Sequence, residues 1–126
     1  MFRISQYMEE IAHPTPLGPK RHPPGPVVIW NLIRRCNLTC KHCYSISADK
    51  DFPGELPTAE IYGVMDDLKR FRVPVLILSG GEPLLRPDIF EIAARAAGLG
   101  FYVGLSTNGT LIDEPMAARI AAQGFD

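Results

Sequence analysis

Three cysteines lie within eight residues of the chain, in the segment RRCNLTCKHCYS that spans residues 34–45. They are Cys36, Cys40 and Cys43, and the sequence holds no other cysteine. Thiolates this close together are suited to binding a metal ion or an iron–sulfur cluster, or to redox chemistry. An odd number of cysteines in one tight cluster argues against a disulfide framework and favours a reducing compartment, so we expect a cytoplasmic protein.

The cysteine spacing admits more than one interpretation. Spacings of four and three residues would place the side chains on one face of a helix, but the residues around them are too polar for an apolar stripe, which favours a loop. Zinc would need a fourth ligand, which His13, His22 or His42 could supply, although His42 directly beside Cys43 fits the usual zinc spacing poorly. A cubane iron–sulfur cluster fits better, because three thiolates then leave one iron open to another ligand.

The segments that must position the cysteines alternate between predicted strands and predicted helices. The near-continuous apolar run VVIWNLI predicts a strand covered on both faces. In total, strands are predicted over residues 27–33, 73–79 and 101–106. Apolar residues with helical spacing predict helices over residues 57–71, 87–100 and 113–124. This order predicts an α/β fold with three parallel strands in sequential order and helices on one side, as in half of a β/α barrel or in an open doubly wound sheet.

Polar residues at the helix ends predict caps. Thr58 is the expected N-cap of the first helix, and Asp88 and Glu91 are spaced as a capping box for the second. Asp113 is expected to cap the third helix, and Gly124 to end it.

Two segments of different composition divide the chain. Residues 1–26 combine a predicted short helix over residues 1–12 with a proline-rich arm over residues 13–26, which holds six prolines. Residues 27–126 carry the predicted β/α domain. The formal charge of −1 indicates no general attraction to nucleic acid or to acidic membranes. We see no signal peptide and no apolar run long enough to span a membrane.

Unusual loops follow all three predicted strands. The cysteine segment follows the first, SGGEP (79–83) follows the second, and STNGT (106–110) follows the third. Loops at the carboxyl ends of parallel strands gather on one face of β/α folds, and that face binds ligands. The sequence therefore predicts one site built from these three loops.

The motifs C-x3-C-x2-C and GGEP, in this order and each after a strand, resemble those of the radical S-adenosylmethionine (radical SAM) enzyme superfamily. The resemblance runs from about residue 27 to residue 126 and implies a partial, TIM-like β/α barrel. It implies that Cys36, Cys40 and Cys43 hold a [4Fe-4S] cluster whose fourth iron binds S-adenosyl-L-methionine. An electron from a reductant such as flavodoxin or ferredoxin then cleaves this cosubstrate to methionine and a 5′-deoxyadenosyl radical.

The same resemblance implies roles for residues near the cluster. His42 stands where many relatives have a larger residue near the adenine. Gly80 and Gly81 would let the backbone approach the methionine end of the cosubstrate, and Glu82 and Pro83 would fix that turn.

Other residues carry two interpretations each. Tyr44 would contact substrate or cofactor, or pack structurally. Ser106, Thr107 and Asn108 would face the cavity, or form a turn that needs no ligand. Arg86 would cap the loop or face substrate, or be a solvated side chain, and we expect the last of these.

The amino-acid sequence around both motifs resembles the sequences of the haem d1 biosynthesis family of radical enzymes. That resemblance implies a tetrapyrrole substrate whose propionate side chains are removed. Related radical enzymes act on peptides or mature peptide-derived cofactors, which is the alternative. A non-catalytic metal-binding β/α module is the alternative from another class.

The strands that in this superfamily carry the ribose-binding and adenine-side segments are missing from the sequence. We therefore expect the chain to correspond to the N-terminal half of such an enzyme. On this expectation the 126 residues alone are inactive, because the third strand keeps an unpaired edge and the cosubstrate lacks part of its walls.

Overall fold

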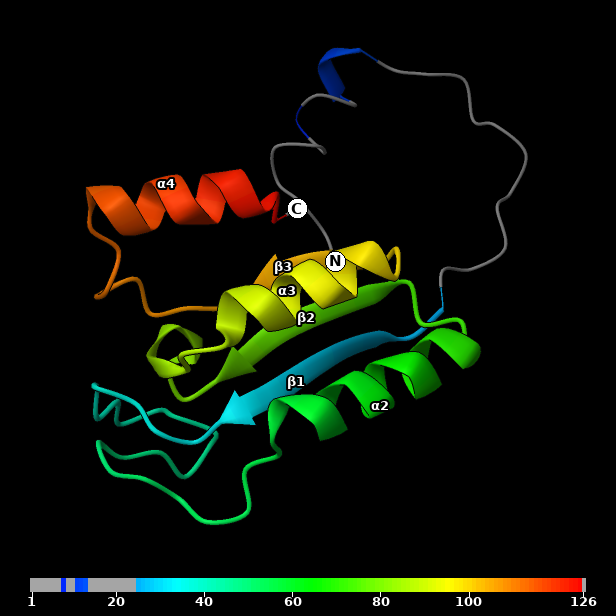
Figure 1. Ribbon diagram of the computed structural model, residues 1–126. Coiled ribbons are helices and arrows are strands. Elements are labelled where there is room, and N and C mark those ends of the chain that lie inside the picture. The colour runs from blue at the N-terminus through cyan, green and yellow to red at the C-terminus, as the bar shows by residue number, and fades with distance from the viewer. Residues whose placement is uncertain (1–7, 9–10, 14–24, 126) are drawn as a thin grey trace.

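The computed structural model describes residues 8, 11–13 and 25–125. The predicted N-terminal helix and proline-rich arm lie largely outside the described residues. The elements in chain order are β1 (Val27–Ile33), α2 (Thr58–Arg70), β2 (Val75–Gly80), the 3-10 turn η1 (Pro83–Leu85), α3 (Ile89–Gly98), β3 (Tyr102–Leu105) and α4 (Glu114–Gln123) (Figure 1). No helix within the described ranges is both long and apolar enough to cross a bilayer.

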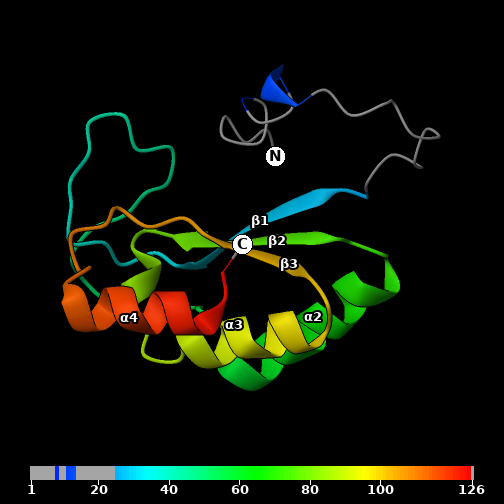
Figure 2. The ribbon, with the colours of Figure 1, turned by 90° about the horizontal axis from the view of Figure 1, so that it is seen from above.

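The three strands form one parallel sheet in the order β1-β2-β3, with β2 in the centre. Figure 2 shows α2, α3 and α4 together on one side of this sheet. The predicted α/β architecture is therefore confirmed. The parallel direction follows from the crossover helices, which return the chain to the same end of the sheet before each new strand.

The hydrophobic core lies between the sheet and the helices. Leu76 and Leu78 of β2 are fully buried, and they belong to the same cluster as Ile61 of α2 and Ile92 of α3. Complete burial of one such aliphatic side chain contributes about 1.5–3 kcal/mol. This packing holds β2 and the two helices together, and so fixes the strand ends that carry the loops.

The face of β1 that points away from the helices is open, and here the expectation of a strand covered on both faces is wrong. Ile29 is 63% exposed, and Val27 and Asn31 are also exposed. In β2, by contrast, Ile77 on the same face is only 4% exposed. β1 is the outer strand, and no described element covers this part of its open face.

Two of the predicted helix caps are wrong. The N-cap position of α2 is Pro57, and the hydroxyl of Thr58 donates to Oδ2 of Asp88 at 2.6 Å. Asp88 occupies the N-cap position of α3 but accepts no hydrogen bond from that helix, because its carboxylate binds Thr58 and Arg86 instead. Glu91 accepts from the Tyr62 hydroxyl at 2.6 Å, so the capping box does not form.

Both ends of α4 form as the sequence predicts. Oδ1 of Asp113 accepts from the amide of Met116 at 2.8 Å, as an N-cap does. Gly124 ends the helix in the left-handed conformation, with φ of 69°. Both predictions are confirmed, since these caps depend on neighbours a few residues away.

The two glycines at the end of β2 lie directly against the end of β1. The amide of Gly81 donates to the carbonyl of Ile33 at 2.7 Å, and the amide of Glu82 donates to that of Arg35 at 2.9 Å. A Cβ atom on Gly81 would lie 2.3 Å from the Arg35 oxygen. Glycine is therefore required here by the packing of the two backbones, whatever ligand binds nearby.

This close approach predicts a destabilised Gly81→Ala variant. The new methyl group would force the two backbones apart, so we expect the free energy of unfolding to fall by about 1–3 kcal/mol or more. Gly63→Ala is the matched control, because nothing lies within 4 Å of a Cβ there and the residue is inside α2. That control should gain about 1 kcal/mol from helix propensity. Urea unfolding measures both, and equal stabilities would contradict the prediction.

Candidate functional site

Hydrogen bonds join the cysteine loop to the loop after β3. Nδ2 of Asn37 donates to Oγ1 of Thr110 at 2.7 Å, and Nδ2 of Asn108 donates to Oδ1 of Asn37 at 3.0 Å. These residues lie 71–73 positions apart in the sequence. The carboxyl ends of β1 and β3 therefore bring their loops into contact, as the strand order predicts.

The three cysteines are free thiols in different surroundings. Cys36 is buried, with 8% of its surface exposed, and its amide donates to the carbonyl of Ala48 at 3.1 Å. Cys40 and Cys43 are exposed. The loop thus holds one thiol firmly and leaves two at its surface.

The surroundings of Cys43 favour its thiolate. The hydroxyl groups of Ser45 and Ser47 lie 3.3 and 3.5 Å from its sulfur atom. Hydrogen bonds to Ser45, and then to Ser47, lower the pKa of Cys43 below its ordinary value. The thiolate is the form that binds iron.

The donor chemistry of the loop is that of an iron–sulfur cluster site. Within the described residues, no three side chains of His, Cys, Asp or Glu come together closely enough to hold one metal ion. A cubane cluster binds each thiolate through a different iron atom, so the sulfur atoms must surround a wider volume. Three free thiols on one loop, one of them in a thiolate-favouring environment, could each supply one such ligand.

His42 and Tyr44 lie at the surface of the cysteine loop. His42 is exposed beside Cys43. Tyr44 is 76% exposed, and its hydroxyl donates to Oδ1 of Asn31 at 2.9 Å, on the open face of β1. Both side chains are therefore accessible to a ligand.

The loop after β2 points its carboxylate inward. Glu82 is fully buried, and its Oε1 accepts from the amide of Leu84 at 2.9 Å and the hydroxyl of Thr107 at 2.7 Å. Its Oε2 accepts from the amide of Asn108 at 2.7 Å. Pro83, next in the chain, is buried as well. The carboxylate of Glu82 is therefore occupied by protein donors, and the residue as a whole is buried.

The loop after β3 presents its residues in alternate directions. The amide of Ser106 donates to the carbonyl of Leu78 at 2.9 Å, while the residue itself is exposed. Thr107 turns towards Glu82, and Asn108 turns towards the cysteine loop. Of the three predicted contacts, Ser106 is therefore free to meet a ligand, whereas Thr107 and Asn108 bind other protein groups.

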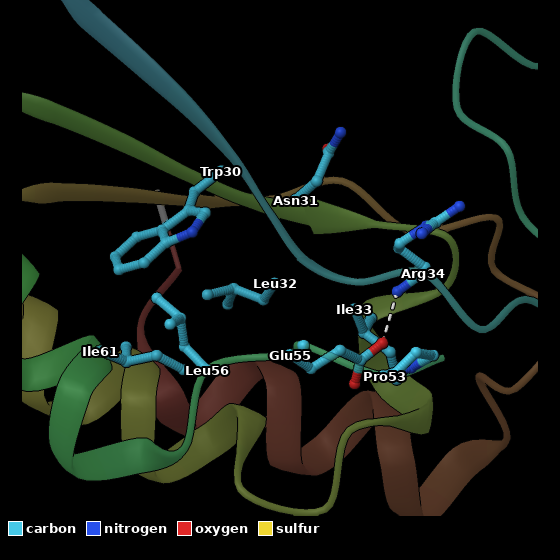
Figure 3. Close-up of a pocket in the computed structure, with 10 residues that line it drawn as sticks. Trp30, Asn31, Leu32, Ile33, Arg34, Pro53, Glu55, Leu56 and Ile61 are labelled. Atoms are coloured by element: carbon cyan, nitrogen blue, oxygen red, sulfur yellow. Dashed lines mark hydrogen bonds between the residues drawn. The ribbon is translucent and has the colours of Figure 1, made fainter. Parts of the chain in front are cut away.

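Two arginines hold the returning part of the cysteine loop. The backbone amide of Arg34 donates to Oε1 of Glu55 at 2.8 Å, the contact drawn in Figure 3. The side chain of Arg35 forms ion pairs with Asp49 at 2.9 Å and Asp51 at 3.2 Å. The hydrogen bond and charge of Asp49 come first among the contacts that raise the pKa of Arg35. These contacts close the loop over residues 34–55.

A small pocket of about 130 Å³ lies where β1 meets this returning segment (Figure 3). Trp30, Leu32, Leu56 and Ile61 give it apolar walls. Trp30, Leu32 and Ile61 belong to, or pack against, the core beneath the sheet, so these walls of the pocket lie on the helix side. The thiols belong to the loop beyond the end of β1, and no cysteine lines this pocket.

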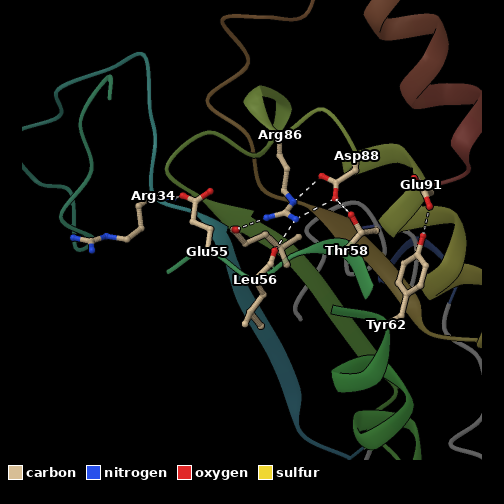
Figure 4. Close-up of polar contacts among 9 residues, drawn as sticks. Arg34, Glu55, Leu56, Thr58, Tyr62, Arg86, Asp88 and Glu91 are labelled. Carbon is tan, nitrogen blue, oxygen red and sulfur yellow. Dashed lines mark hydrogen bonds and ion pairs between the residues drawn. The ribbon is translucent and has the colours of Figure 1, made fainter. Parts of the chain in front are cut away.

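Arg86 was expected to be solvated, and this is wrong. Its side chain is buried and donates to the carbonyls of Leu32 at 3.0 Å and Leu56 at 2.9 Å (Figure 4). Its Nε lies 2.7 Å from Oδ1 of Asp88. Burial alone would raise the pKa of Asp88, but hydrogen bonds from Arg86 and Thr58 and the arginine charge outweigh it and lower that pKa.

Arg86 thus ties the end of β1 to the start of α2, the two ends of the cysteine-bearing connection. The sequence PLLRPD did not indicate that this arginine is buried between those two segments. The roles of Asn37 and Thr110, whose side chains join two loops, were also missed. A polar residue directly beside Cys36, and another just after STNG, were the available signals.

The family model described as the radical SAM superfamily matches residues 30–126. A pre-heme d1 synthase of Dinoroseobacter shibae is 57% identical over all 126 residues, which are 31% of that relative. An Fe-coproporphyrin III synthase of Methanosarcina barkeri is 50% identical over 100 residues, 79% of this chain and 25% of the relative.

A mycofactocin maturase of Mycobacterium tuberculosis is 41% identical over 96 residues, 76% of this chain and 24% of the relative. The chain therefore spans a third or less of the length of these curated relatives. The family match covers most of the chain, including the end of β1, all of β2 and β3, and all three loops. The chain belongs to the radical SAM superfamily, a family of enzymes that use an iron–sulfur cluster and S-adenosylmethionine.

Proposed function

We propose that the chain carries the cluster- and cosubstrate-binding part of a radical SAM enzyme that removes propionate side chains from a tetrapyrrole in haem d1 biosynthesis. The gathering of the cysteine, GGEP and STNG loops at one edge of the sheet carries the chemical part of this proposal. The 57% identity over the whole chain to a pre-heme d1 synthase supports the substrate class.

Cys36, Cys40 and Cys43 would hold a [4Fe-4S] cluster. When bound, this cluster supplies the electron that cleaves S-adenosyl-L-methionine to methionine and a 5′-deoxyadenosyl radical. The buried Cys36 would provide one ligand from inside the loop, and the exposed Cys40 and Cys43 would bind the cluster from its surface. A small electron-transfer protein such as flavodoxin or ferredoxin would provide the electron, in the cytoplasm.

The segment Gly80–Pro83 would orient the methionine end of the cosubstrate. The amides of Gly81 and Glu82 already donate to the carbonyls of Ile33 and Arg35, so the segment would meet an ammonium group through carbonyl oxygens, which accept hydrogen bonds. His42 would lie near the adenine. Ser106 and Tyr44 are exposed at this edge and would contact cosubstrate or substrate.

The test is anaerobic reconstitution of the chain with iron and sulfide. We expect a brown protein with broad absorption and acid-labile sulfide, and binding of S-adenosylmethionine detected by calorimetry. A colourless protein that takes up zinc instead would contradict the proposal and support a structural metal site.

The substrate class needs its own measurement. We expect a propionate-bearing tetrapyrrole to bind, with a shift of its absorption spectrum. A mycofactocin maturase is also among the relatives, so a peptide is the natural comparison. Binding of a peptide but not of the tetrapyrrole would overturn the substrate assignment and leave the cluster assignment intact.

A further inference from the structure

A buried carboxylate fixes the backbone of Asn108. Glu82, which is fully buried, accepts hydrogen bonds from the amide of Leu84, the hydroxyl of Thr107 and the amide of Asn108. A buried charge held by several donors keeps one position, because loss of any donor leaves it poorly compensated. The start of the STNG turn is therefore anchored to the GGEP loop.

The direction of the Asn108 side chain is determined as well. Its Oδ1 accepts from the amide of Thr110 at 2.9 Å and from the Thr110 hydroxyl at 2.7 Å. A backbone amide can only donate, so the oxygen of Asn108 must face Thr110 and the NH2 group must face the other way. That NH2 group lies 3.0 Å from Oδ1 of Asn37 and 3.8 Å from the sulfur of Cys36.

Cys36 is the buried thiol of the three, so it has the least water to stabilise a negative sulfur atom. An N–H donor stabilises a thiolate most strongly in a buried site of this kind, where water does not compete for the sulfur atom. From this geometry we infer that Asn108 is a positioning residue for the Cys36 thiolate, holding it through an N–H···S hydrogen bond that tunes a bound cluster. The inference rests on the proposed function in taking Cys36 as a cluster ligand.

The hydrogen bond from Asn108 should shift the reduction potential of the cluster in one direction. Hydrogen bonds to cluster sulfur atoms stabilise the added negative charge of the reduced state and so raise the reduction potential. Loss of the Asn108 amide should therefore make the cluster harder to reduce, although all three cysteines remain. An asparagine that only formed a turn would have no such effect.

The experiment compares Asn108→Leu with Thr110→Val in the reconstituted chain. Asn108→Leu removes the amide donor without adding charge, whereas Thr110→Val removes a hydroxyl from the same network and keeps the donor. In a dithionite titration followed by electron paramagnetic resonance, we expect a more negative midpoint potential for Asn108→Leu alone, and a several-fold smaller reduced fraction at a fixed poise. Equal potentials in both variants would overturn the inference.

Failure to bind a cluster is also informative. If only Asn108→Leu loses its cluster while its circular dichroism matches Thr110→Val, the positioning role is supported. If the unmodified chain binds none, the proposed function fails, and alkylation of the cluster-free chain at fixed pH decides the inference. Cys36 should then react several-fold more slowly in Asn108→Leu than in Thr110→Val, because loss of the N–H donor leaves a smaller fraction of the reactive thiolate. Exposed Cys40 is the internal reference, and equal rates would overturn the inference.

Discussion

Replacement of any one of Cys36, Cys40 and Cys43 by Ala is expected to cause near-complete loss of a reconstituted [4Fe-4S] cluster. The chain has no fourth cysteine that could take over the missing position. Two thiolates would leave two iron atoms of the cubane without a protein ligand, which exposes them to solvent and to oxygen. Iron and sulfide analysis, with Mössbauer spectra, measures the loss.

The matched control for the cysteine variants is Ser45→Ala. The Ser45 hydroxyl lies 3.3 Å from the sulfur of Cys43, so this change perturbs the same loop but keeps all three thiols. We expect it to retain the cluster. A cysteine variant with undiminished iron and sulfide would show that its thiol is not a ligand.

Arg86→Met is expected to lower the free energy of unfolding by about 3–5 kcal/mol, the usual cost of removing one partner of a buried ion pair. Asp88 would keep a partly buried charge without its arginine. The carbonyls of Leu32 and Leu56 would each lose a donor. Leu32 lies where the β1–β2 register shifts, and a residue at a bulge is left outside the regular ladder. Against a total stability of about 5–15 kcal/mol, this is a large loss.

Arg95→Met is the control for this prediction. Arg95 pairs with Asp66 at 2.8 Å, but both side chains are more than 40% exposed. An exposed pair of this kind contributes about 0–1 kcal/mol. Urea unfolding followed by circular dichroism measures both variants. If Arg86→Met and Arg95→Met cost equally little, the buried cluster around Arg86 does not hold the cysteine-bearing connection as the contacts indicate.

The order and direction of the strands could be predicted from the sequence. Apolar runs alternating with amphipathic helices leave few topologies, because crossover connections are right-handed and keep neighbouring strands parallel. The strand predicted over residues 27–33 matches β1 at both ends, and the ends of the other elements differ by one or two residues. Caps made by near neighbours were equally accessible, as Asp113 and Gly124 show.

The candidate site was predictable in its residue types and its place on the fold. Cysteines and glycines at strand ends carry a chemical signal in their identity, and the direction of parallel strands places their loops at one edge of the sheet. The superfamily was therefore evident from the motifs, and the family match confirms it.

Only the tertiary structure decided what each polar side chain does. Arg86 and Leu32 lie 54 residues apart, and Asn108 and Cys36 lie 72 residues apart. Local pattern made Arg86 a surface residue and Asp88 a cap, but burial changes the outcome, because a charged group removed from water must find partners wherever the fold supplies them. Exposure of one face of β1 was likewise undetermined by its apolar sequence. Which elements cover a strand depends on how the chain packs around it, and not on the strand's own residues.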